Sequence, residues 1–306
     1  MSEIKFSKFM KTLVEHLEKK GLSDNTVKSY IHRLYIVNDK NKFTSLKFLK
    51  DHEIIISKLK ERLTPSTQKS YAGTICSVLS LKPTKANEKL KKIYNSFISD
   101  EDIQKIQNPK TKPESWMEKD EILKIKNDLT AQAEMFYKND TLGSLQYNVL
   151  LKNALLSFYV NLPPRRSSDY ALMKYQNDTE DKKFNYLTTN NKLLFNNYKT
   201  DKTYGTQEVN ISSNKALLKD IKMYLKHRVE HEDNMLFVKQ NGKAFNAIND
   251  ITRTLNAIFK KNISTTVLRK MYVTHKYGAL KEEMLQDSEA MGHSVTMQQT
   301  HYNKGS

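Results

Sequence analysis

The stretch KLLFNNYKTDKTYGTQEVNI (residues 192–211) marks the point where the periodicity of the sequence changes from helical to strand-like. The segments KLLF (192–195) and QEVNI (207–211) predict two strands, and the turn-forming DKTYG between them predicts a hairpin. Further strands are expected at 184–186 and, more briefly, at 236–238, before an NGK turn. Helical spacing prevails on both sides of this region. The sequence therefore predicts a mainly α chain with a small antiparallel β-sheet.

Residues 1–108 show helical spacing throughout, in stripes of apolar residues separated by Gly21, Pro65 and Pro83. The polar stretch QNPKTKPES that follows is typical of a boundary between domains. Beyond it, Ser115 with a glutamate three residues later predicts a capping box and a new helix, and residues 145–160 predict a long apolar one. We expect a helical domain at 1–108, a linker at 109–114 and a second domain at 115–306.

The charge of the chain is strongly positive. There are 51 Lys and Arg against 34 Asp and Glu, a net charge of +17. Residues 1–108 carry 21 basic and 12 acidic side chains, so both parts of the chain are basic. This excess favours a polyanionic partner such as nucleic acid, held from two sides, although a compositional bias towards Lys and Asn explains part of it.

The cellular compartment is indicated by the near absence of cysteine and by the absence of a signal peptide or a long apolar run. Cys76 is the single cysteine and lies on an apolar helical stripe, so we expect a buried thiol in a reducing compartment. No run of 18 apolar residues occurs, and MSEIKFSKFMK has no apolar core of a signal peptide. We expect a protein that is not secreted and has no membrane partner.

Four short segments of the second domain carry candidate chemistry. Each has an ordinary explanation when taken alone: a solvated ion pair, lysines in a turn, an arginine reaching out of an apolar helix face, and a histidine that caps a helix. The segments are LPPRRSSDYALMK with Arg166 and Asp169, YKTDKTYG with Lys199 and Lys202, STTVLRKMYVTH with Arg269, and MGHSVTMQQTHY with His293 and Tyr302.

The order Arg, Lys, Arg, His, Tyr suits phosphodiester transesterification without a metal. A tyrosine oxygen attacks phosphorus while arginines and a histidine neutralise the charge that grows on the non-bridging oxygens. A lysine on a hairpin is suited to protonate the departing 5′ oxygen. The covalent intermediate stores the bond energy, so the reaction needs no ATP.

Together these segments resemble the signature boxes of the tyrosine recombinases, the phage-type integrase family. The first box matches Arg166 and Asp169, with Arg165 as the neighbour out of register, and the hairpin lysine matches Lys199. Leu268-Arg269 is similar to the family's second arginine box, Met291-Gly-His-Ser294 to its Leu-Gly-His-Ser segment, and Tyr302 falls at the position of the nucleophile. GLSDNTVKSY, in the first domain, is similar to the family's helical core-binding domain.

The resemblance implies a site-specific recombinase that works through a 3′-phosphotyrosyl intermediate and a four-way junction. It implies a helical SAM-like core-binding domain, an α+β catalytic domain, and no metal or other cofactor. The partners implied are double-stranded DNA with inverted half-sites, a homodimer on one site and a homotetramer in the synapse. The composition favours a viral or mobile-element integrase, located in the cytoplasm, or in a host nucleus or viral factory. Residues expected to contact DNA are Lys202, Arg165, Lys270, Lys28, Arg33 and Lys69.

One residue departs from the family's pattern. Thr266 occupies the position where the family usually has His or Lys, three residues before the second arginine. Thr266 is suited to donate a hydrogen bond to phosphate, while Lys270 and water are the alternatives for the general base. Two other functions stay open: a type IB DNA topoisomerase, which uses a similar residue set, and a DNA-binding relative with impaired catalysis.

Overall fold

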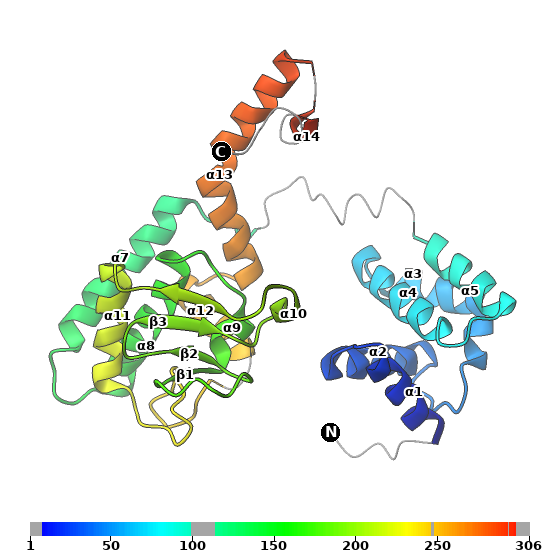
Figure 1. Cartoon of the computed structure of the whole chain (residues 1–306), viewed down its shortest axis with the longest axis horizontal. Coiled ribbons are helices and arrows are strands. Elements are labelled where there is room, and N and C mark those ends of the chain that lie inside the picture. Colours follow the sequence, from blue (N-terminus) through cyan, green and yellow to red (C-terminus); the bar gives the residue numbers. More distant parts are fainter. Residues whose placement is uncertain (1–7, 99–113, 246–247, 293, 298–306) are drawn as a thin grey trace. The chain divides into compact units, whose positions relative to one another are not determined.

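The computed structural model describes residues 8–98, 114–245, 248–292 and 294–297. The chain divides into two compact units, residues 1–111 and 112–306 (Figure 1). Residues 109–113 of the expected linker lie outside the described residues. None of the helices within the described ranges combines the length and apolar character needed to cross a bilayer.

The first unit is helical, as its sequence periodicity predicts. Its boundaries follow capping residues: the Ser23 side chain accepts a hydrogen bond from Thr26 N at the start of the second helix, and Pro65 occupies the first turn of another. The elements are α1 (Lys8–Lys19), α2 (Asp24–Val37), the 3₁₀ helix η1 (Lys47–Lys50), α3 (His52–Arg62), α4 (Pro65–Leu79) and α5 (Lys85–Ser96).

The core of this unit draws one fully buried side chain from each of five elements: Leu17, Leu34, Leu49, Ile75 and Tyr94. Burying each aliphatic side chain contributes about 1.5–3 kcal/mol. The hydroxyl of Tyr94 donates to the Leu49 carbonyl oxygen at 2.9 Å, which satisfies the one polar group of that aromatic ring. The unit therefore has a core of its own.

The second unit combines helices with a small sheet. Helix α8, which the long apolar run predicts, buries ten of its 17 residues and packs against α7 and α11. The helices are α7 (Lys119–Phe136), α8 (Ser144–Val160), α9 (Ser167–Ala171), α10 (Asp201–Tyr204), α11 (Lys215–His227), α12 (Ile248–Phe259), α13 (Thr265–Ala290) and α14 (Val295–Met297).

The sheet has four strands in the order β1-β2-β3-β4. They are β1 (Met173–Tyr175), β2 (Asn185–Leu187), β3 (Lys192–Phe195) and β4 (Gln207–Asn210). The hairpin is confirmed: β3 pairs antiparallel with β4, and Leu193 faces Val209. The fold class, mainly α with a small sheet, is confirmed as well. The sheet is mixed, however, because β1, which the sequence analysis does not predict, pairs parallel with β2.

Three local expectations are wrong. Helix α7 begins at Lys119 with Glu118 as its N-cap, so Ser115 caps nothing. Residues 236–238 form no strand; there are only isolated bridges, at Met235 and at Val238. The DKTYG segment is the short helix α10 followed by Gly205, whose φ of 65° lies in the left-handed region that glycine adopts easily.

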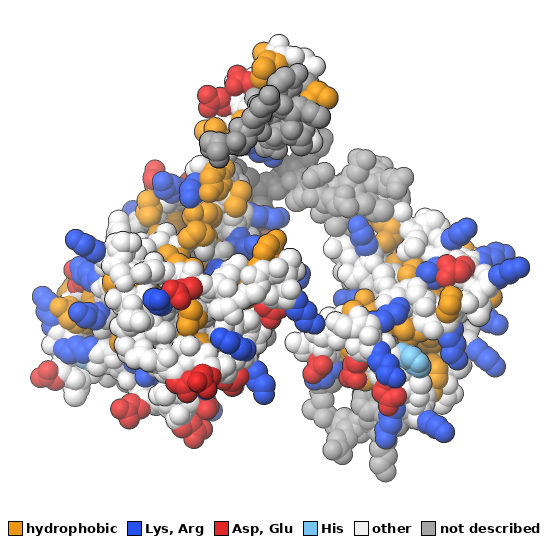
Figure 2. Space-filling model, viewed as in Figure 1, with side chains coloured by type: hydrophobic (Ala, Val, Ile, Leu, Met, Phe, Trp, Pro, Cys, Tyr) orange, Lys and Arg blue, Asp and Glu red, His pale blue; other side chains and the backbone are white. Residues whose placement is uncertain are grey.

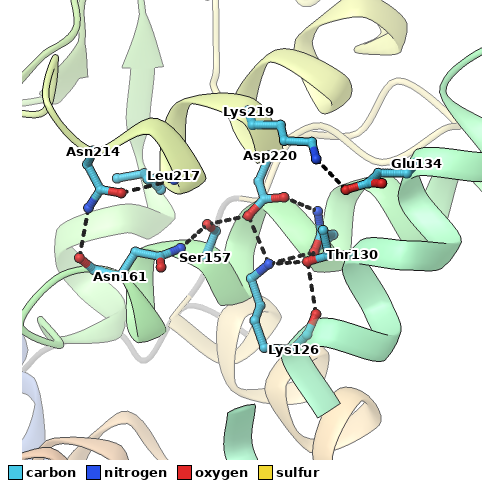
Figure 3. Close-up of polar contacts among 10 residues, drawn as sticks. Lys126, Thr130, Glu134, Ser157, Asn161, Asn214, Leu217, Lys219 and Asp220 are labelled. Atoms are coloured by element: carbon cyan, nitrogen blue, oxygen red, sulfur yellow. Dashed lines mark hydrogen bonds and ion pairs between the residues drawn. The ribbon is translucent and has the colours of Figure 1, made fainter. Parts of the chain in front are cut away.

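A buried polar network joins three helices of this unit (Figure 3). Lys126 Nζ on α7 lies 2.8 Å from Asp220 Oδ2 on α11, and the two side chains are only 7% and 3% exposed. Asn153 and Ser157 on α8 each donate a hydrogen bond to the same carboxylate, at 2.8 and 2.7 Å. Because every charge in the network is paired, it fixes how α7, α8 and α11 pack.

Candidate functional site

A cleft of about 420 Å³ lies between the start of α9, strands β3 and β4 with their connection, and the first turns of α13. Most of its wall is apolar or aromatic. The charged or amide side chains that line it are Arg165, Arg166, Asp169, Gln207 and Arg269. The structure thus brings Arg166 and Arg269, which the sequence analysis singles out from separate segments, to one cavity.

Both of these arginines are half-buried. In the part of the chain that the structure describes, neither guanidinium group makes a hydrogen bond or an ion pair. A buried or half-buried arginine normally satisfies its donors on carboxylate or carbonyl oxygens. Two such groups facing one cleft are suited to bind an anion, and the planar, forked donors of arginine match a phosphate.

Local structure explains why Arg166 and Arg269 line the same cavity. Arg166 follows Pro163 and Pro164 and is the N-cap residue of α9, with extended backbone angles (φ −73°, ψ 155°). The next residue, Ser167, lies with its Oγ 3.2 Å from Oγ1 of Thr265, the first residue of α13, and both side chains are buried. This contact joins the starts of the two helices, so residues near each start line the same cavity.

Asp169 forms an ion pair with Arg165. The sequence pattern instead associates Asp169 with Arg166. Asp169 Oδ2 accepts a hydrogen bond from Arg165 Nε at 3.0 Å, four positions back. The carboxylate is 3% exposed, so the pair is no solvated surface interaction. Periodicity alone does not distinguish the two neighbouring arginines, because either lies within one helical turn of Asp169.

The two hairpin lysines, Lys199 and Lys202, are exposed and lie in the connection between β3 and β4. Lys199 is not at the end of a strand, since β3 ends at Phe195, and Lys202 belongs to α10. Thr200 and Tyr204 of the same connection line the cleft. The lysines therefore lie on the segment that forms one border of the cavity.

The remaining catalytic candidates are placed only in part. Thr266 and Lys270 lie on α13 and are exposed, and neither lines the cleft. His293 and Tyr302 lie outside the described residues. Their roles stay predictions.

No family model and no curated protein matches this chain. Among solved structures, it is similar to the crystal structure of XerA recombinase, with 14% sequence identity and a TM-score of 0.35, over 90% of this chain and 85% of that chain.

Three tyrosines that the sequence does not mark as functional also line the cleft. Tyr170 is fully buried, and burial raises the pKa of its hydroxyl above the ordinary value, so it stays protonated. Tyr198 donates its hydroxyl to the Gly205 carbonyl oxygen at 2.7 Å. Tyr204 is 67% exposed. Only the third has the access that a nucleophile needs, and no sequence signal separates it from an ordinary surface tyrosine.

The first unit holds the other DNA-binding candidates. Lys28 on α2 and Lys69 on α4 are exposed. Arg33 is engaged within the unit: its Nη1 donates to the Ser70 carbonyl oxygen at 3.2 Å and to Thr74 Oγ1 at 3.0 Å. Arg33 therefore joins α2 to α4, which is a structural role.

The described residues contain no group of three or more His, Cys, Asp or Glu side chains placed to hold a metal ion. The candidate site is a cationic cleft. It offers two arginine forks inside and two lysines on its border. Such a site is suited to neutralise a phosphodiester.

Proposed function

We propose that this chain is a tyrosine-type site-specific DNA recombinase, an integrase that cleaves and rejoins duplex DNA. The observation that carries the proposal is the pair Arg166 and Arg269, whose guanidinium groups make no hydrogen bond or ion pair among the described residues. They line one cleft of about 420 Å³ although they lie far apart in the sequence. The order of Lys199, His293 and Tyr302 around them supports the same chemistry.

In the proposed reaction the Tyr302 oxygen attacks the scissile phosphorus and forms the P–O(tyrosine) bond. The bond between phosphorus and the 5′ oxygen breaks. The hydroxyl proton of Tyr302 passes to water or another base, and Lys199 gives a proton to the 5′ oxygen as it leaves. Arg166, Arg269 and His293 hold the non-bridging oxygens, whose charge grows in the transition state.

The first unit would grip the duplex beside the cleavage site through Lys28 and Lys69, and Lys202 and Lys270 would add phosphate contacts on the second. Figure 2 shows Lys and Arg side chains distributed over both units on the face in view. Phosphate contacts of this kind give affinity without sequence information. We propose inverted half-sites, a dimer on each site and a tetramer in the synapse, serving the integration of a viral or other mobile element.

Covalent trapping from a random-sequence library tests the proposal without a known target. Nicked duplexes carrying a randomised segment are incubated with the full chain, and DNA that stays attached under denaturing conditions is sequenced. We expect an adduct joined at the 3′ phosphate and a recovered sequence motif. No adduct, together with tight binding of duplex, would leave the chain as a DNA-binding relative with impaired catalysis.

Two tyrosine variants identify the nucleophile. Tyr302→Phe is expected to form no adduct, while Tyr204→Phe, which alters the exposed tyrosine that lines the cleft, is expected to keep it. The opposite result would assign the nucleophile to Tyr204. Strand exchange between two recovered sites then separates a recombinase from a type IB topoisomerase, which would relax supercoiled DNA without exchanging strands.

A further inference from the structure

Arg165 makes contacts that differ from those of its neighbour Arg166. Its Nε donates to Asp169 at 3.0 Å, and its Nη1 donates to Gln207 Oε1 at 2.8 Å. Its guanidinium carbon lies 3.8 Å from the ring centroid of Phe195, over the face of the ring, and 5.0 Å from that of Tyr198. The side chain is 21% exposed. Two directed hydrogen bonds and a stacked ring hold this guanidinium group in one orientation.

These contacts fall at both ends of one segment. Phe195 is the last residue of β3, and Gln207 is the first residue of β4. Arg165 therefore joins the two ends of the β3–β4 connection to each other and, through Asp169, to α9. Tyr198, the fourth residue that it touches, immediately precedes Lys199.

Asn185 on β2 also makes hydrogen bonds to this segment. Asn185 Oδ1 accepts from the backbone N–H groups of Asn196 and Asn197, each at 2.8 Å, and its Nδ2 donates to the carbonyl oxygens of Asp169 and Asn197. Asn185 fixes the start of the connection only. Arg165 holds both ends and also contacts the residue next to the lysine.

We infer that Arg165 is a positioning residue: it fixes the base of the β3–β4 connection and thereby places Lys199 for proton donation to the leaving 5′ oxygen. This inference rests on the proposed function. It replaces the expectation that Arg165 contacts DNA. Arg166 and Arg269, which have no hydrogen-bond partner among the described residues, are the arginines proposed to contact the phosphate, while Nε and Nη1 of Arg165 donate to protein groups.

The experiment uses the full chain as the enzyme and compares two DNA substrates, both of which carry the recovered target sequence. One has the natural 5′ oxygen at the scissile bond, and the other has sulfur there. A thiol is a far stronger acid than an alcohol, so the sulfur departs as thiolate and needs no proton. Any defect in proton donation is then seen with oxygen and disappears with sulfur, whereas a defect in phosphate binding or folding affects both substrates.

We expect Arg165→Ala to slow cleavage of the oxygen substrate by about 10- to 100-fold, a share of the usual contribution of a general acid. Cleavage of the sulfur substrate should stay near the wild-type rate, as it should for Lys199→Ala. The double variant Arg165→Ala, Lys199→Ala should be no slower than Lys199→Ala alone, because the two changes remove one function. Arg165→Lys should resemble Arg165→Ala, since lysine keeps the charge but loses the fork and the flat stacking face.

Gln207→Ala is the control for a folding defect, because it removes only the bond to β4 and keeps the ion pair of Arg165 with the buried Asp169. It should show a smaller defect with the same dependence on the leaving atom. Equal slowing of both substrates by Arg165→Ala and Gln207→Ala would overturn the inference while the proposed function stands. Failure of the wild-type chain to cleave either substrate would instead overturn the proposed function.

Discussion

Lys126 and Asp220 form an ion pair in which both charged side chains are buried. The carboxylate accepts three hydrogen bonds, from Lys126, Asn153 and Ser157, and the ammonium group also bonds Asn153 and Thr130 (Figure 3). A buried pair of this kind adds little over an apolar pair of the same shape. Removing one member alone is costly, because the other charge stays buried without compensation.

We therefore expect Lys126→Met to lower the free energy of unfolding of the second unit by about 3–5 kcal/mol. Urea denaturation followed by the fluorescence of Trp116, the single tryptophan, reports on this unit. Lys219→Met is the matched control, since it breaks a surface pair with Glu134 on the same two helices, α7 and α11. That control should unfold like the wild type. An equal loss in both variants would contradict the buried-network explanation.

At the site, Arg269 is expected to act on the transition state more than on binding. Arg269→Ala should lower the cleavage rate by about 10²- to 10³-fold, the usual effect of losing one donor to a developing oxyanion. Single-turnover cleavage of the recovered target measures it. Arg253→Ala removes an exposed arginine of α12 in the same unit and should leave the rate unchanged. If both variants lose activity equally, the effect of Arg269 is one of overall charge.

The sequence predicts which segments form the site better than it predicts which side chains contact each other there. Arg166 and Arg269 are found from their types and order, and the structure brings them to one cleft. The partner of Asp169 is not found, because choosing between Arg165 and Arg166 depends on Phe195 and Gln207, which lie in strands far along the chain. Long-range packing therefore decides which of the two arginines bonds to Asp169.

Among the elements, the helices are predicted well because their apolar stripes repeat over several turns, as in α8. The errors fall on short segments. Strand β1 has three residues, too few for a period to show, and its parallel pairing with β2 depends on tertiary structure. Helix α10 has four residues and reads as a turn in the sequence. Short elements obtain their stability from neighbours, which local pattern does not reveal.

Two glycines test how far backbone conformation determines helix stability. Gly278 lies inside α13, where a Cβ would meet only Thr274 Cγ2 at 3.8 Å; Gly21 follows α1 with a φ of 76° and open space around it. Gly278→Ala should therefore stabilise α13 by about 0.5–1 kcal/mol. Gly21→Ala should destabilise the end of α1 by about 1 kcal/mol, because alanine is strained in the left-handed region.

Amide hydrogen exchange along α13 and α1 measures the two effects locally. Slower exchange in α13 of Gly278→Ala and faster exchange at the end of α1 of Gly21→Ala are the expected results. Space is ample at both positions, so a change of the same sign in both variants would show that something other than the backbone angle decides.

On the scale of the whole molecule, the positive charge is divided evenly between the two parts of the chain. Residues 1–108 carry 21 basic and 12 acidic side chains out of totals of 51 and 34. A nucleic-acid-binding tail attached to a neutral enzyme would concentrate the excess in one part. The even division implies that, if the chain binds duplex as proposed, each unit neutralises its own set of phosphates and releases its own counterions.

The affinity for duplex should consequently fall more steeply with salt for the full chain than for residues 1–108 alone. Each neutralised phosphate adds about −0.9 to the slope of log K against log salt concentration. Fluorescence anisotropy with a labelled duplex over a range of KCl concentrations measures both slopes. Equal slopes would confine phosphate binding to the first unit.

In the full chain, Lys28→Ala and Lys69→Ala should each make the slope shallower by about one. Arg33→Ala should leave it unchanged, because that guanidinium bonds Ser70 and Thr74 within the unit.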